Sequence, residues 1–201
     1  GLASTYAGCS VVNDTIRVPA NASHVTGVDT RVQGFPAGTI SLWFTPAYTT
    51  SPAVNTVIFS CSRPGTVLNS MILTHKTTGF LNLTVYDDTN LTPAVDVDMG
   101  AAYVANPNTA VHIEVDYYNT FNVQLYIDGV QRGATVPIAF SRIDTTLFTL
   151  GGANASVGGY YANVQCWPYY RNTENHSSSA PLPTAILEGH WDTRSGPQLS
   201  Y

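Results

Sequence analysis

The sequence predicts an all-β protein, an antiparallel sandwich of two sheets, and three observations support this prediction. First, residues 111–118 and 122–127 alternate apolar and polar side chains with the period of two that a half-buried strand requires. Second, Asp128-Gly129 follows directly, and this pair is a strong signal for the tight turn of a β-hairpin. Third, no segment of about eleven residues keeps a helical apolar spacing without an interrupting Gly or Pro.

Strand segments follow one another along the chain, each bounded by turn residues such as Gly, Pro, Asn, Asp and Ser. So many short strands are typical of a sandwich, with a closed barrel as the less favoured alternative. In order, we expect strands at Thr15–Pro19, Gly38–Thr45, Thr56–Ser62, Ser70–Thr74, Phe80–Tyr86, Ala94–Asp98, Val111–Tyr118, Phe121–Ile127, Val130–Ala134, Thr146–Leu150 and Ala162–Tyr169.

Alternation also predicts which side chains form the core. On the two central strands, the apolar residues at alternate positions share one face, and that face is expected to turn toward the opposite sheet. Burying each large apolar side chain contributes about 1.5–3 kcal/mol. The residues expected between the sheets are Trp43, Ile113, Val115, Leu125, Ile127 and Val164.

Composition sets limits on the class of protein. A chain of 201 residues with 44% hydrophobic residues suits one domain, residues 1–201, with a sandwich core at about 10–172 and an extended tail, Ala180–Tyr201. Charged residues are only 10% and the net charge is −5, which argues against a nucleic-acid partner because phosphate binding needs a basic surface. No apolar window approaches the length of about 18 residues that membrane insertion requires.

Cysteines and glycosylation signals are uninformative about function. Cys9, Cys61 and Cys166 are far apart and lack the CxxC spacing of a zinc site, so buried thiols are favoured over one disulfide with a third thiol left over. The sequence begins without a methionine or a visible signal peptide, which leaves a processed chain or a fragment open. Asn-x-Ser/Thr sequons, which this Asn- and Thr-rich composition produces by chance, occur at Asn13, Asn21, Asn82, Asn90, Asn154 and Asn175.

The order and spacing of several strands resemble a known family. The segments that carry the resemblance are Asp14–Pro19, Gly38–Pro46, Val57–Ser60, Phe80–Val85, His112–Asp116, Leu125–Gly129, Leu147–Gly152 and Tyr160–Arg171. Together they are similar to laminin-G-like, pentraxin-type domains, which have a concanavalin A-like jelly-roll fold. This resemblance implies a jelly-roll sandwich over about residues 10–172. It leaves the activity open, because the fold hosts both glycan binders and glycan-cleaving enzymes.

Glu114-Val115-Asp116 is the sequence feature that most suggests an enzyme. Glycoside hydrolases of this fold carry E-x-D-x-x-E, in which two carboxylates flank the scissile bond as nucleophile and acid/base. Here the sixth position is Asn119, and an amide cannot donate and recover a proton. The histidines lack metal-ligand spacing and no GxSxG elbow is present, so we predict no catalytic residues and a non-enzymatic protein, with His112 as a hydrogen-bonded structural residue.

Calcium is the cofactor that the resemblance suggests, since such domains often bind it through loop oxygens. Asp87 and Asp88 lie in an acidic turn that ends at Asn90, and Asp96 and Asp98 share one strand face. Because Ca²⁺ takes 6–8 oxygen ligands, neither motif suffices alone, and a solvated turn is the simpler interpretation. The hypothesis is therefore a calcium ion at Asp87 and Asp88.

Aromatic residues suggest a glycan platform. Tyr160 and Tyr161 follow Gly158-Gly159, so flexible backbone precedes two rings on which a sugar could stack. The resemblance places this segment beside the acidic turn, and the predicted ligand site is accordingly Asp87, Asp88, Asn90, Tyr160 and Tyr161. For any single tyrosine, packing in the core is the competing interpretation.

Three functions are consistent with these features. The favoured one is a non-enzymatic recognition module, extracellular or on a virion as a tail, fibre or capsid-decoration protein, that binds host glycans. Its low charge leaves uncharged, partly apolar surface, so we expect association with copies of itself or with other virion subunits, using the tail Ala180–Tyr201 as an arm. The alternatives are a purely structural capsid or fibre subunit with no sugar ligand, and a glycoside hydrolase or lyase of the same fold.

Overall fold

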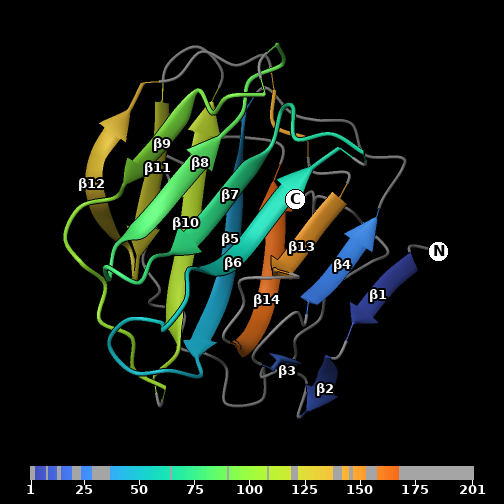
Figure 1. The fold of residues 1–201 in the computed structure, drawn as a ribbon, viewed down its shortest axis with the longest axis vertical. Coiled ribbons are helices and arrows are strands. Elements are labelled where there is room, and N and C mark those ends of the chain that lie inside the picture. The colour runs from blue at the N-terminus through green and yellow to red at the C-terminus, as the bar shows by residue number, and fades with distance from the viewer. Residues whose placement is uncertain are drawn as a thin grey trace.

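The computed structural model is an antiparallel β-sandwich (Figure 1), as the sequence predicts. It describes residues 3–7, 9–12, 15–19, 24–28, 37–63, 65–89, 91–107, 109–118, 122–137, 142–144, 147–152 and 158–167. Every named element among these residues is a strand. Consequently, this part of the chain holds no helix long and apolar enough to cross a membrane.

Among the described residues, seven strands form the first sheet, in the spatial order β1-β4-β13-β6-β7-β8-β9. Each neighbouring pair in it is antiparallel. The bounds are β1 Ala3–Ala7, β4 His24–Val28, β13 Leu147–Gly151, β6 Thr56–Ser62, β7 Met71–His75, β8 Leu81–Val85 and β9 Val95–Asp98.

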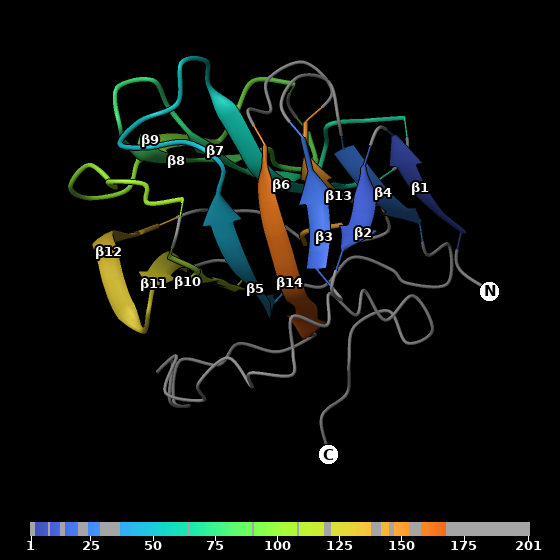
Figure 2. The same ribbon diagram turned by 90° about the horizontal axis from the view of Figure 1, so that it is seen from below.

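The second sheet contains seven further strands in the part of the chain that the structure describes, in the order β12-β11-β10-β5-β14-β3-β2, again antiparallel throughout. Figure 2 shows the two sheets as separate layers packed face to face. The bounds are β12 Val130–Val136, β11 Asn122–Ile127, β10 Val111–Tyr118, β5 Ala37–Pro46, β14 Gly159–Trp167, β3 Thr15–Val18 and β2 Ser10–Val12.

The central hairpin forms as its sequence predicts. Asp128 and Gly129, with φ of 50° and 75°, link β11 to β12, and two successive positive φ angles define the turn that matches strand twist. The Asp128 carboxylate accepts a hydrogen bond of 2.9 Å from the backbone N–H of His112, and the Asp128 N–H donates one of 2.9 Å to the His112 carbonyl. The turn is thereby tied to the start of β10.

The core lies between the sheets and confirms most of the predicted set. Apolar side chains at alternate positions of both sheets are buried there, including Leu42, Phe44, Phe59, Leu73, Leu83, Tyr117 and Leu150. The five predicted residues that are buried are Ile113, Val115, Leu125, Ile127 and Val164.

Trp43 is the exception, and the prediction that it belongs to the core is wrong. Leu42 and Phe44 point into the core, so the period of two turns Trp43 to the outer face of the second sheet. There it is half-buried, and its ring lies 5.3 Å from the ring of His112. Local hydrophobicity suggested burial, but strand geometry decided the face.

The eleven predicted strands are all present, and the described residues contain three further strands that the sequence did not predict. β1, β2 and β4 are three to five residues long and rich in Ser, Thr and Gly, so they lack a clear apolar alternation. Among the described strands, β1 and β2 are edge strands that pair only with β4 and β3, and β4 lies between β1 and β13. Partner strands, rather than their own sequence, define them.

Cys61 is buried in the core, and its thiol donates a hydrogen bond to the Met71 carbonyl. Cys9 packs half-buried against the same core, and burial raises the pKa of its thiol. Other predictions fall outside the described residues: the tail Ala180–Tyr201, the side chain of Cys166, Asn119, and the sequons at Asn13, Asn21, Asn90, Asn154 and Asn175.

Candidate functional site

Three connections meet at one end of the first sheet. In the register of that sheet, Ser62 lies opposite Leu147, and Met71 lies opposite Val85. The segments that leave these positions are 63–70 after β6, 86–94 after β8, and 142–144 before β13. Loops at a sandwich end carry function while the sheets hold them in place, so this cluster is a natural position for a site.

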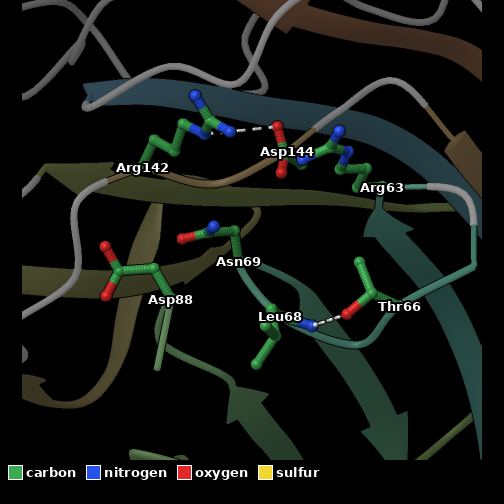
Figure 3. Close-up of a pocket in the computed structure, with 7 residues that line it drawn as sticks. All are labelled: Arg63, Thr66, Leu68, Asn69, Asp88, Arg142 and Asp144. Atoms are coloured by element: carbon green, nitrogen blue, oxygen red, sulfur yellow. Dashed lines mark hydrogen bonds and ion pairs between the residues drawn. The ribbon is translucent and has the colours of Figure 1, made fainter. Parts of the chain in front are cut away.

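The three connections enclose a pocket of about 380 Å³, within the range of about 300–1,000 Å³ that is typical of small-molecule sites. Figure 3 shows the side chains from the separate segments converging on it. One aliphatic residue, Leu68, contributes to the wall, and every other lining residue is polar or charged: Arg63, Thr66, Asn69, Asp88, Arg142 and Asp144. Such a lining favours a polar, hydroxyl-bearing ligand over an apolar one.

Backbone hydrogen bonds hold the three segments together. The Asn69 N–H donates to the Asp87 carbonyl at 2.9 Å, and the Asp144 N–H donates to the Asn69 carbonyl at 2.7 Å. Asn69 is buried and has a left-handed φ of 55°, a conformation that Asn tolerates better than most residues. This residue therefore links the other two segments and presents its amide to the pocket.

An ion pair forms part of the wall. Asp144 is buried, and its Oδ1 lies 3.5 Å from Nε of Arg142, whose side chain is 39% exposed. Two polar atoms of these pocket-lining residues, the second carboxylate oxygen of Asp144 and the Nε of Arg142, are buried without a hydrogen-bond partner among the described residues. Because native proteins rarely leave buried polar atoms unsatisfied, this concentration indicates a place for water or a ligand.

The structure separates the predicted acidic residues by role. Asp88 is exposed and lines the pocket. Asp87 instead accepts hydrogen bonds from the backbone N–H of Thr89 at 2.8 Å and from its hydroxyl at 3.1 Å, so its carboxylate closes a local turn. Asn90 lies outside the described residues.

Tyr160 and Tyr161 do not lie beside this pocket, which corrects the predicted juxtaposition. β13 begins next to the pocket and ends at Gly151, and Gly152 approaches Val57 at the far end of β6. β14 starts from that far end, where Gly159 pairs with Pro46. In Figure 1 the exit of β6 lies at the upper edge of the sandwich and the exit of β5 at the lower edge.

The two tyrosines also face opposite ways. Tyr161 is buried, its ring centroid lies 5.0 Å from that of Phe44, and burial raises its pKa well above the usual range. It is a core residue and cannot serve as a stacking platform. Tyr160 is 37% exposed on the outer face of the second sheet, opposite Arg17 and Thr45.

The two carboxylates of β10 that suggested a glycoside hydrolase do not line the pocket. Glu114 and Asp116 occupy the outer face of the second sheet, and both are fully buried. The Thr39 hydroxyl donates a 2.5 Å hydrogen bond to Asp116, and Ser41 is hydrogen-bonded to Nε2 of His112 at 2.7 Å. His112 is thus hydrogen-bonded, as predicted, and the carboxylates form part of a buried polar layer.

Metal ligands do not gather in the described part of the chain. No group of three or more His, Cys, Asp or Glu there could hold a metal ion. Asp96 and Asp98 each accept a hydrogen bond from the Asn82 amide, at 3.0 and 3.1 Å, and Asp98 pairs with Lys76 at 2.8 Å. The calcium hypothesis at Asp87 and Asp88 stays a prediction.

Sequence reasoning missed most of the pocket. Arg63, Asn69, Arg142 and Asp144 belong to no recognisable motif, and they are separated by up to about eighty positions in the chain. The sequence contained one clue to these residues, which is that each lies just before or just after a predicted strand. In the structure, those strand ends lie at the same end of one sheet. Only the register of the strands shows that these ends coincide.

No protein-family model and no curated protein sequence match this chain. Solved structures do resemble it. The binding domain of botulinum neurotoxin serotype G is 13% identical with a TM-score of 0.65, over 89% of this chain and 46% of that one. The binding domain of botulinum neurotoxin DC, in complex with SialylT, gives 12% and 0.65, over 85% and 43%.

A Trypanosoma rangeli sialidase is also similar, with 14% identity and a TM-score of 0.62, over 87% of this chain and 28% of the sialidase. This chain spans less than half the length of each of the three. At such low identity, the likeness shows that the chain shares their β-sandwich fold.

Proposed function

We propose that this protein is a non-enzymatic carbohydrate-recognition module, and that the pocket between the three loops is its glycan site. One observation carries the proposal: the pocket is lined almost wholly by charged, amide and hydroxyl groups, and it contains a buried Asp144 oxygen that has no partner among the described residues. Sugar hydroxyls both donate and accept hydrogen bonds, so they match a wall that offers acceptors and donors together.

The similar structures support recognition of glycans. Cell entry of botulinum neurotoxin type C, a structure with 10% identity and a TM-score of 0.64 to this chain, depends upon interaction with two ganglioside molecules. Another similar domain was solved in complex with SialylT, whose name indicates a sialylated ligand. By analogy, we assign to this chain the binding of cell-surface glycans by the loops of its β-sandwich. Such a function places the protein outside the cell.

Burial of the β10 carboxylates supports the non-enzymatic part of the proposal. A glycosidase places two carboxyl groups on either side of the scissile bond, in contact with substrate. Glu114 and Asp116 are 0% exposed, so neither side chain reaches a ligand on the surface. The similarity to a sialidase makes a glycoside hydrolase or lyase the alternative with a specific observation behind it.

The setting we propose is the surface of a virion, as a tail, fibre or capsid-decoration protein that associates with copies of itself. Low charge and abundant uncharged polar residues support this setting, because such a surface favours close packing with other subunits. A purely structural capsid or fibre subunit with no sugar ligand is the competing function.

A glycan array probed with the full chain tests the proposal. We expect binding that falls about tenfold in Asp88→Asn, because a charge-assisted hydrogen bond to a hydroxyl contributes about 1.5–3 kcal/mol. Asp96→Asn, which changes an exposed aspartate on β9 that does not line the pocket, is the matched control and should bind normally.

Two results would contradict the proposal in different ways. Absence of binding to every glycan would favour the structural alternative. Binding that survives Asp88→Asn and Asp144→Asn but is lost in Tyr160→Ala would keep glycan recognition and move the site to the exposed tyrosine on the second sheet.

A further inference from the structure

The charges around the pocket are unevenly placed. Two guanidinium groups, from Arg63 and Arg142, approach the same cavity. Asp144 pairs with Arg142, whereas Arg63 is exposed and has no ion-pair partner within the described residues. Arg63 therefore adds to the pocket a positive charge that is not part of an ion pair among the described residues.

Acceptors lie on both sides of the pocket, with Asp144 beside Arg63 and Asp88 across from it (Figure 3). Figure 3 shows Asp88 and Arg63 on different sides of the pocket, with Asn69 between them. Asp88 is exposed, and the second oxygen of Asp144 is buried with no partner in the part of the chain that the structure describes. Ionised carboxylate oxygens accept hydrogen bonds only, so a ligand must bring donors, such as hydroxyl groups, to Asp88 and Asp144.

We infer that the pocket takes a sugar that carries a carboxylate, with the acidic group at Arg63 and hydroxyl groups at Asp88, Asn69 and Asp144. A guanidinium presents parallel N–H donors that match the two oxygens of a carboxylate. Neutral sugars leave Arg63 without a counter-charge, and compact anions without hydroxyl groups face repulsion from Asp88 and Asp144. A hydroxylated acid satisfies both sides.

The size of the pocket narrows the ligand further. At about 380 Å³ it lies near the small end of the range for ligand sites, so it holds one acidic sugar unit rather than a long chain. The remainder of a glycan would extend into solvent past Asp88. This inference rests on the proposed function, because it names the sugar class that the same site selects.

Matched ligands test the inference by calorimetry on the full chain. The probes are 3′-sialyllactose, the same trisaccharide with its carboxylate converted to a methylamide, a disaccharide ending in glucuronic acid with its amide counterpart, lactose, and 3′-sulfolactose. We expect at least one acid to bind about tenfold or more tightly than its own amide, since a charge-assisted hydrogen bond is lost.

Arg63→Gln should abolish the difference between that acid and its amide, while the amide binds as weakly to the variant as to the unchanged protein. Arg17→Gln is the matched control, because Arg17 is an exposed arginine on β3 near the opposite end of the sandwich. Thermal melting of each variant verifies that the fold is retained, and exposure of Arg63 means that its replacement leaves the core untouched.

Several results would overturn the inference. If each acid and its amide bind equally, or if Arg63→Gln weakens both alike, the carboxylate is not recognised, and glycan binding as such still stands. Preference for 3′-sulfolactose over both acids would show that the anion is a sulfate. If no probe binds and the glycan array is also blank, the proposed function itself fails.

Discussion

Gly100 and Gly133 meet backbone to backbone where β9 and β12, the edge strands of the two sheets, approach each other. A Cβ placed on Gly100 would lie 2.5 Å from the Gly133 nitrogen, and a Cβ on Gly133 would lie 2.7 Å from the Gly100 nitrogen. Both residues also have a left-handed φ, of 73° and 71°. This seam closes one side of the sandwich because neither residue has a side chain.

Gly100→Ala should therefore destabilise the protein more than an ordinary glycine replacement. Gly65 is the matched control, since it has a φ of 80° but nothing within 4 Å of the methyl group that an alanine would add. We expect about 1–2 kcal/mol of lost unfolding free energy in Gly65→Ala, from φ alone. Gly100→Ala should lose a further ~1–3 kcal/mol through overpacking. If urea denaturation gives the same loss of unfolding free energy for Gly65→Ala and Gly100→Ala, the backbones at the seam are not in tight contact.

Glu114→Gln should not change the rate at which glycosidic bonds are cleaved, because Glu114 is buried and cannot contact a substrate. We expect no release of reducing sugar from β-glucans or sialylated substrates by either form. By contrast, Thr39→Val removes the hydroxyl that donates to buried Asp116 and should cost about 1–3 kcal/mol of stability. Turnover that disappears in Glu114→Gln would establish an enzyme and remove the non-enzymatic assignment.

Acidification should destabilise the fold through His75. Its Nε2 donates to the Gly79 carbonyl at 3.1 Å, and its Nδ1 is hydrogen-bonded to the Tyr48 hydroxyl at 2.8 Å, which donates to Nδ1 when the ring is neutral. Burial lowers the pKa of His75 below its ordinary 6.5. The rings of Tyr48 and Tyr103 face it. Burial raises the pKa of both phenols, that of Tyr103 to about 12, so neither carries a negative charge near neutral pH.

Proton uptake determines the direction in which stability changes with pH. Below pH 6.5 the unfolded chain binds a proton that folded His75 does not, so the stability present above this pH falls as the pH drops toward the folded pKa. Melting temperatures measured from about pH 7 to pH 5 should decline, and His75→Gln should flatten that decline. An unchanged slope in the variant would assign the pH dependence to other groups.

The sequon at Asn82 should remain unmodified when the chain is secreted from a eukaryotic cell. Asn82 is only 3% exposed, and its amide nitrogen donates to both Asp96 and Asp98. A glycan on that nitrogen would replace one donor and require space that the sheet does not provide. Peptide mass spectrometry should find the unglycosylated form in the folded fraction, and high occupancy there would contradict this arrangement.

A calcium ion at Asp87 and Asp88, as the sequence resemblance suggests, makes a distinct prediction. Calcium binding to the folded state would raise the melting temperature as the ion concentration increases, and a chelator would reverse the rise. Asp88→Asn should abolish this response if that carboxylate is a ligand. A melting curve that is the same with calcium and with chelator would show that Asp88 does not bind calcium, and would leave sugar binding as its proposed role.

The amino-acid sequence by itself determined the fold class and most of the strands. Periodicity is a local property, and it placed Ile113, Val115, Leu125 and Ile127 on the buried face, while Asp128-Gly129 specified its turn. The same rule, applied strictly, would have turned Trp43 outward. The error there came from weighing the hydrophobicity of one residue above its position in the alternation.

Only the tertiary structure decided the site. Asp88 was predicted as a ligand residue, but Arg63, Asn69 and Arg142 join it because β6, β8 and β13 have their loop ends at the same edge of one sheet. Tyr161 was excluded because the pairing of β14 with β5 points it at Phe44. Strand order and register are set by contacts between distant segments, and local sequence patterns carry no record of those contacts.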